Sequence, residues 1–169
     1  DQKRLFVCER GVENGYGVMS VEKLKSVILA VLNQCGEVFC TKMNKLLFYI
    51  DFLAYRRHGM SLTGLSYRAL PYGPVPERWD RIYSCFEEVV LEPRIVGGRE
   101  GLAIVPMKDI ESVVLSPEQM EVISLVCDRF KDCSATDISN ISHQEDAWLD
   151  CHAEHLRIPY EYAFKLKAV

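Results

Sequence analysis

The stretch from His143 to His155 contains the side chains of this sequence that most often bind metal ions. A mononuclear zinc site would take its ligands from this stretch, and Glu145 would act beside it as a general base. The potential ligands are His143, Cys151, His152 and His155. Neither H-E-x-x-H nor H-x-x-E-H occurs there, so the spacing is poor. A metal-dependent hydrolase that uses His143, His152 and His155 is therefore only an alternative function, and we expect neither a metal ion nor another cofactor.

Other enzyme signatures are missing. The sequence has no G-x-x-x-x-G-K-[ST] phosphate loop and no G-x-S-x-G nucleophile elbow. Its seven cysteines form no C-x-x-C pair, and their odd number favours reduced thiols. We therefore expect a cytoplasmic protein that is not an enzyme. No membrane partner is expected either, because no apolar run approaches the ~20 residues that span a bilayer.

The stretch "ALPYGPVPERWDRIY", Ala69–Tyr83, places three prolines and a glycine close together. Each proline fixes φ near about −65° and biases the preceding residue toward extended geometry, so this stretch holds its shape. One interpretation is a structural corner between a strand and a helix, with Pro76 in the first helical turn and Tyr72 packed as a lid. The other is a preorganised binding loop that exposes Tyr72, Val75 and Trp79.

The two interpretations are compatible, and the structural role is the preferred main one. The candidate partner-binding residues are Tyr72, Gly73, Pro74, Val75, Pro76 and Trp79.

Hydrophobic periodicity predicts a mainly α (α+β) fold, a compact helical domain with a small antiparallel sheet. Helices are predicted from the Ser20 cap to Gly36, from the Thr41 cap to Gly59, over about 77–87, from the capping box 116–119, from the cap at 134–137, and from Pro159. A strand is predicted around 65–69 and a hairpin around Gly97 and Gly98, with Pro93 and Pro106 confining it to a sheet edge. These strands are expected to form one sheet of two or three strands.

The predicted second helix is apolar nearly all round, which makes it the central helix. Asp51 lies on it, and its carboxylate is either buried and hydrogen-bonded, paired with a basic residue such as Arg68, or placed to contact a partner. The buried interpretation is preferred, so Asp51→Ala is expected mainly to destabilise the fold.

The composition is that of one globular domain. The 169 residues are 49% hydrophobic and 26% charged, with a net charge of −4. Residues 1–19 have no regular periodicity and are interpreted as an arm or linker before a domain that spans 20–169. A winged-helix DNA-binding regulator, with Arg94 and Arg99 on the hairpin as its wing, is the first alternative function, ahead of the hydrolase. The acidic net charge and the lack of a basic helix weaken it.

The sequence "TKMNKLLFYIDFLAYRRHGMSLTGLSYRALPYGPVPERWDRIY" resembles the Panacea domain, also called the SocA-like antitoxin domain, of bacterial and phage toxin-antitoxin systems. In that family K-x-N-K-L-L-F-Y-x-D-F leads through S-x-T-G to L-P-Y-G-P-V-P. A second block, "SHQEDAW", is similar to the family's later S-H-x-E-x-A-W segment. The resemblance covers roughly Val21 to Leu166, and its structural motif residues are Lys45, Asp51, His143, Glu145 and Trp148.

The resemblance implies a mostly helical protein that binds and neutralises a cognate toxin, often encoded beside it, and that is not an enzyme. It further implies that His143 and Trp148 pack a helix junction. Members frequently carry an N-terminal zinc-ribbon or helix-turn-helix part, and "ENGYGVMSVEKL" is similar to the junction that follows one. Contact with DNA is therefore expected only through such an N-terminal region.

Overall fold

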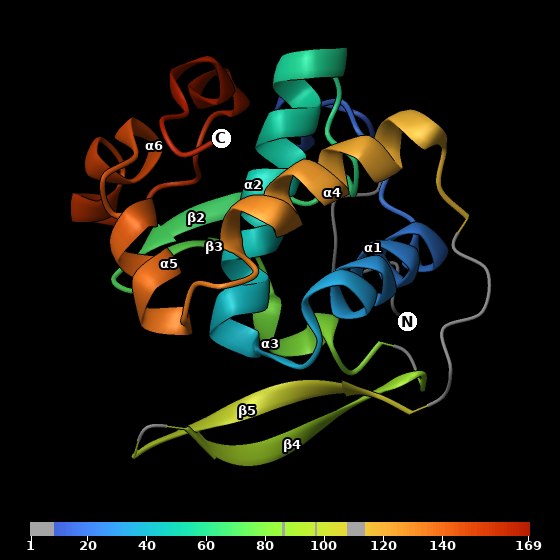
Figure 1. Cartoon of the computed structure of the whole chain (residues 1–169). Helices are drawn as coiled ribbons and strands as arrows, with labels where there is room; N and C mark the ends of the chain where they lie inside the picture. The colour runs from blue at the N-terminus through green and yellow to red at the C-terminus, as the bar shows by residue number, and fades with distance from the viewer. Residues whose placement is uncertain (1–8, 86, 97, 108–113) are drawn as a thin grey trace.

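The computed structural model describes residues 9–85, 87–96, 98–107 and 114–169 (Figure 1). Its α-helices are α1 Val21–Cys35, α2 Cys40–His58, α3 Trp79–Ile82, α4 Pro117–Phe130, α5 Ala135–Ser142 and α6 Asp146–Leu149. Its 3-10 helices are η2 Val12–Asn14, η3 His152–Glu154 and η4 Tyr160–Lys165. Its strands are β1 Val38–Phe39, β2 Tyr67–Leu70, β3 Gly73–Pro76, β4 Val89–Val96 and β5 Arg99–Pro106. The prediction of a mainly helical α+β domain is confirmed.

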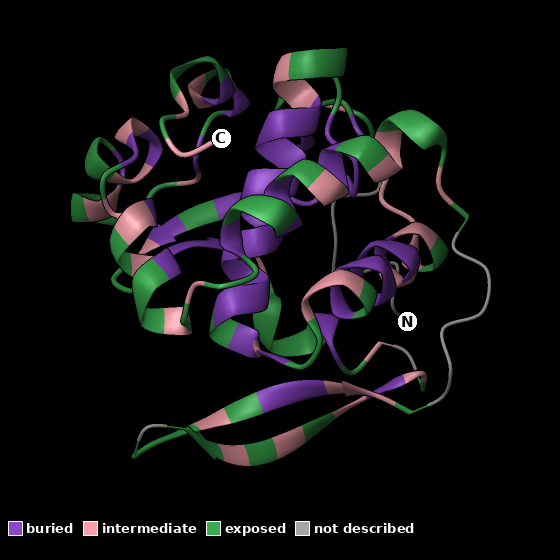
Figure 2. Ribbon diagram, in the orientation of Figure 1, coloured by how far each residue is buried: buried purple, intermediate pink, exposed green. Residues whose placement is uncertain are grey.

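Helix α2 is the centre of the fold. Every residue from 42 to 54 is buried, and the helix contacts α4, α5, β3 and η4 (Figure 2). Aromatic rings fill the space around it: Phe52 stacks on Tyr160 with ring centroids 4.4 Å apart and meets Tyr67 edge to face at 5.8 Å. A helix that is apolar on all sides is stable only when neighbours cover all of it, which explains its central position.

Local capping sets most helix boundaries where the sequence predicts them. The hydroxyls of Ser20, Ser116 and Ser134 each accept a hydrogen bond from the backbone at the start of α1, α4 and α5. Gly59 ends α2 in the left-handed conformation, with φ 73°. The predicted start of α2 is wrong by two residues, because the helix begins at Cys40 with Phe39 in the cap position and does not use Thr41 as its cap.

The proline-rich stretch is a β-hairpin and not a corner between a strand and a helix. Strand β3 pairs antiparallel with β2, and the register joins Tyr67 to Pro76 and Leu70 to Gly73. The predicted helix over 77–87 is present only in part: among the described residues of this range the helical ones are Trp79–Ile82, and Arg78 before them has φ 60°. Pairing with β2 holds Pro76 in extended geometry, so Pro76 cannot serve as the first residue of a helix.

The predicted hairpin around Gly98 is present as β4 and β5, but its third strand is not the predicted one. The order in this sheet is β1-β5-β4, whereas β2 and β3 form a separate two-stranded sheet. Pro93 does lie on the edge strand β4, while Pro106 ends the central strand β5. The missed strand β1 has only two residues, too few for an alternating pattern to reveal it.

The described part of the N-terminal segment packs on the loop that follows α2. The side chain of Asn14 is fully buried, and its backbone carbonyl accepts a hydrogen bond from the hydroxyl of Ser61 at 2.5 Å. The backbone N–H of Ser61 in turn donates to the carbonyl of Gly15 at 2.8 Å. Of the helices in the described ranges, none has the length and apolar character that crossing a membrane requires.

Candidate protein-binding groove

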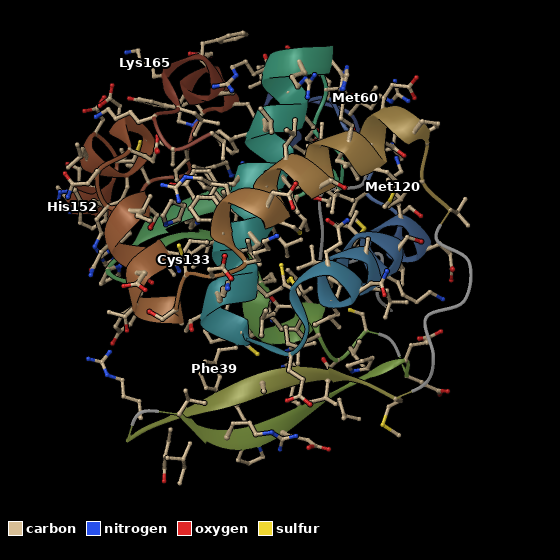
Figure 3. All side chains as sticks on the ribbon, viewed as in Figure 1. Phe39, Met60, Met120, Cys133, His152 and Lys165 are labelled. Atoms are coloured by element: carbon tan, nitrogen blue, oxygen red, sulfur yellow. The ribbon has the colours of Figure 1, made fainter. Side chains whose placement is uncertain are left out.

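A groove with a volume of about 680 Å³ lies between the β4–β5 hairpin and the helical body. Its walls come from β1, β4, β5, the start of α2, helix α5, the β2–β3 turn and α3. Figure 3 shows Phe39, at the junction of β1 and α2, between β5 and the body. This volume falls within the ~300–1,000 Å³ typical of ligand sites.

Four large apolar side chains in the groove wall are exposed to solvent. Tyr72 is 76% exposed and Val96 is 62% exposed, while Leu102 and Trp79 are exposed by 48% and 42%. Clustered exposed apolar and aromatic side chains are characteristic of protein-binding surfaces. The groove is therefore the best candidate for a partner site in the described structure.

The candidate residues of the proline-rich stretch do not share one environment. Only Tyr72 and Trp79 line the groove. Val75 is 5% exposed, so the prediction that it is exposed is wrong, and Gly73, Pro74 and Pro76 are buried as well. Tyr72 is not a packed lid, because it lies at the turn of the hairpin and points into solvent. The alternation of side chains along a strand does not by itself explain the burial of Gly73–Pro76 or the exposure of Tyr72. Strand β3 is buried because α2 and α5 cover it.

Gly73 fixes the conformation of the hairpin turn. Its φ of 118° is one that residues with a side chain rarely adopt. A Cβ atom there would lie 2.6 Å from Cε of Lys45 and 2.7 Å from Oγ of Ser142. The turn that presents Tyr72 is thus packed directly against α2 and α5.

Trp148 fastens the same hairpin from α6. Its indole N–H donates a hydrogen bond to the carbonyl of Leu70 at 2.8 Å. The rings of His143 and His152 stack on it with centroids 4.1 Å and 4.0 Å away, one on each face, since two rings cannot share a face at these distances. Burial lowers the pKa of His143, and the carbonyls of Tyr72 and Pro71 partly oppose this shift.

The histidine-rich stretch does not assemble into a metal site. Within the described ranges, no three His, Cys, Asp or Glu side chains lie together as metal ligands. His143 and His152 face Trp148, and the buried carboxylate of Glu145 accepts hydrogen bonds from the backbone N–H groups of Lys167 and Ala168 at 2.9 Å and 3.1 Å. The hydrolase alternative lacks its ligand set, because these side chains serve packing and backbone contacts.

Asp51 organises the loop between α2 and β2. Its carboxylate accepts hydrogen bonds from the backbone N–H of Leu62 at 2.8 Å and of Thr63 at 2.7 Å, and from the hydroxyl of Tyr67 at 2.5 Å. The hydroxyl of Thr63 also donates to it. Burial raises the pKa of Asp51, and these hydrogen bonds oppose the rise. Asp51 is thus the buried, hydrogen-bonded carboxylate of the preferred interpretation, and the alternative pairing with Arg68 does not occur.

The basic side chain of Arg68 lies elsewhere, 3.0 Å from the carboxylate of Glu77. Arg157 joins this carboxylate with two hydrogen bonds, at 2.9 Å and 3.0 Å. This ion-pair cluster connects the β2–β3 hairpin to the C-terminal segment.

Lys45 is a buried cation beneath the hairpin turn. Its side chain is 1% exposed, and burial lowers its pKa to about 8. No hydrogen bond or ion pair links its ammonium group to another described residue. A buried lysine without a counter-ion destabilises a fold. Burial of the Lys45 charge therefore lowers the free energy of unfolding, and the surrounding packing offsets this loss.

The two arginines of the proposed wing are engaged within the protein. Arg94 forms ion pairs with Glu92 at 2.7 Å and Glu37 at 3.4 Å. Arg99 donates to the hydroxyl of Thr136 at 2.7 Å. Both guanidinium groups therefore already have polar partners within the protein.

Of the groove walls formed by the β4–β5 hairpin and α5, only Arg99 and His143 are candidate functional residues in the sequence, and neither is predicted as a partner-binding residue. Val96, Leu102 and Thr136 carry no motif, and their sequence segments predict only a strand or a helix start. The one available signal was the apolar pair Ile95 and Val96 beside the glycine turn, where a solvent-exposed hairpin tip would normally be polar.

Comparison with known proteins supports the resemblance seen in the sequence. The family model "Antitoxin SocA-like, Panacea domain" matches residues 43–149. No curated protein and no solved structure matches the chain. The matched range is shorter than the predicted one, yet it contains the second block, all but the first two residues (Thr41 and Lys42) of the first block, and the β4–β5 hairpin. The chain therefore belongs to the SocA-like antitoxin family and carries its Panacea domain.

Proposed function

We propose that this domain neutralises a cognate toxin by direct, stoichiometric binding through the groove, and that it does so without catalysing a reaction. The observation that carries the proposal is the 76% exposure of Tyr72 on a hairpin turn that is itself immobilised. The SocA-like antitoxin family supplies the class of partner, a toxin.

The groove combines two properties that favour tight protein binding. Aromatic side chains present large apolar area with little rotamer freedom to lose. The backbone below Tyr72 is held by the packing of Gly73 on Lys45 and by the bond from Trp148 to Leu70, so little conformational entropy is lost on binding. Neutralisation would follow because the bound domain covers the working surface of the toxin.

Co-expression with the protein encoded by the adjacent gene tests this function. If that protein arrests growth alone, we expect the domain to restore growth and to co-purify with it in a fixed ratio. Tyr72→Ala should weaken binding by about tenfold or more, as expected for an aromatic hot spot.

Phe164→Ala is the matched control, because Phe164 is an aromatic residue with 65% exposure outside the groove. Its binding should equal that of the unmodified chain. Equal binding by a folded Tyr72→Ala variant would remove the groove from the interface, while a harmless neighbour that does not co-purify would contradict the function.

A further inference from the structure

The groove contains an open strand edge. Strand β1 pairs with β5 only through Val38↔Ile104 and Phe39↔Ala103, and the chain then enters α2 at Cys40. In the described ranges, no strand pairs with residues 99–102 on this side of β5. The same four residues line the groove.

The register identifies which backbone groups point to that edge. The N–H of Met107 donates to the carbonyl of Glu88 at 2.9 Å, which marks this facing pair as hydrogen-bonded. Hydrogen-bonded and non-hydrogen-bonded pairs alternate along an antiparallel ladder. Counting along the register from this pair makes Ile95↔Glu100 a non-hydrogen-bonded pair. The N–H and C=O of Glu100 therefore point away from β4, toward the groove, and no described backbone group outside the hairpin bonds to them.

The opposite edge of the hairpin is blocked. Pro93 faces Leu102 in a non-hydrogen-bonded pair, so its missing N–H is one that would have pointed outward from β4. Proline on an edge strand prevents another strand from adding there. The hairpin thus has one protected edge toward solvent and one open edge toward the groove (Figure 1).

We propose that an extended segment of the bound toxin adds as a strand to the Arg99–Leu102 edge of β5. Backbone hydrogen bonds to Glu100 would provide part of the affinity, as in other cases of strand addition. The segment would carry apolar side chains, because Tyr72, Val96 and Leu102 are exposed around it. This inference rests on the proposed function and specifies the backbone conformation of the partner.

A pair of facing proline variants tests the inference. Glu100→Pro removes an N–H that points into the groove, and Ile95→Pro removes the equivalent outward N–H from the opposite edge of the same residue pair. Neither change removes a hydrogen bond between β4 and β5, so both should perturb the hairpin alike. With the adjacent-gene toxin as probe, we expect Glu100→Pro to weaken binding by about tenfold and Ile95→Pro by less than about twofold.

Amide hydrogen exchange of the unmodified chain gives a second measurement that does not depend on how the variants fold. The Glu100 amide should exchange at least about tenfold more slowly in the complex than in the free chain, whereas the Ile95 amide should be unchanged. Equal binding by the two variants together with an unprotected Glu100 amide would overturn the strand addition and leave the proposed function standing. If the adjacent-gene toxin does not bind the unmodified chain, both the strand addition and the proposed function are overturned. A dimer of this chain that Glu100→Pro abolishes would replace the toxin segment with a second copy and equally overturn the inference.

Discussion

The indole N–H of Trp148 donates a hydrogen bond to the backbone carbonyl of Leu70 across 2.8 Å, although 78 positions separate the two residues. This bond joins the two sequence blocks by which the family is identified. Ser142 adds to the connection, because its hydroxyl lies against Gly73 at the same hairpin turn. The later block therefore holds the β2–β3 hairpin in place, and the hairpin in turn presents Tyr72.

Trp148→Phe should destabilise the fold by about 1 kcal/mol, because the aromatic ring remains but the donor to Leu70 is lost. Chemical denaturation gives the free energy of unfolding, and hydrogen exchange should become faster at the amides around the hairpin turn. Leu149→Ala is a suitable control, since Leu149 is the exposed next residue of α6. An unchanged free energy for Trp148→Phe would show that the Leu70 carbonyl is equally well satisfied by water.

Gly73→Ala should destabilise the protein by about 3 kcal/mol or more, because strain at φ 118° adds to overlap of the new Cβ with Lys45 and Ser142. Gly98→Ala measures the contribution of backbone strain at a positive φ alone. Gly98 also has a positive φ, of 79°, but nothing lies within 4 Å of its Cβ position. We expect about 1 kcal/mol there. Thermal unfolding of both variants measures the difference, and equal losses would contradict the steric argument.

Asp51→Ala should cost about 3–5 kcal/mol, since it leaves the N–H groups of Leu62 and Thr63 and the hydroxyl of Tyr67 buried without an acceptor. Asp51→Asn keeps one carbonyl acceptor of nearly the same shape and should lose less. Urea denaturation distinguishes these outcomes. A loss below about 1 kcal/mol for the alanine variant would mean that water enters the site and replaces the carboxylate.

Lys45→Met should stabilise the fold near neutral pH, because methionine fills similar volume without the cost of burying a charge. In the native state the pKa of Lys45 is about 8, below the ordinary value of 10.5. Between these two pH values the unfolded state binds more protons than the native state, so the free energy of unfolding of the wild type increases as the pH rises. The advantage of the variant should be at most about 3 kcal/mol below pH 8 and should vanish above pH 10.5. Unfolding measured from pH 7 to pH 10.5 tests this, and a variant less stable than wild type at pH 7 would reveal an ion partner for Lys45.

The sequence by itself determined the features that depend on neighbouring residues. The serine caps at 20, 116 and 134, the end of α2 at Gly59 and the pairing of β4 with β5 follow from side chains within a few positions. The family too could be identified from the sequence, because its two blocks are contiguous strings of residues.

Only the tertiary structure decided the features that depend on contacts between distant segments. The burial of Val75 and the exposure of Tyr72 follow from the packing of α2 and α5 on β3, which no local pattern encodes. The stretch with prolines forms a strand because β2 supplies its hydrogen-bond partner, and propensity alone cannot anticipate that partner. The open edge at Glu100 exists because β1 ends opposite Ala103, a fact of strand register and therefore of the assembled fold.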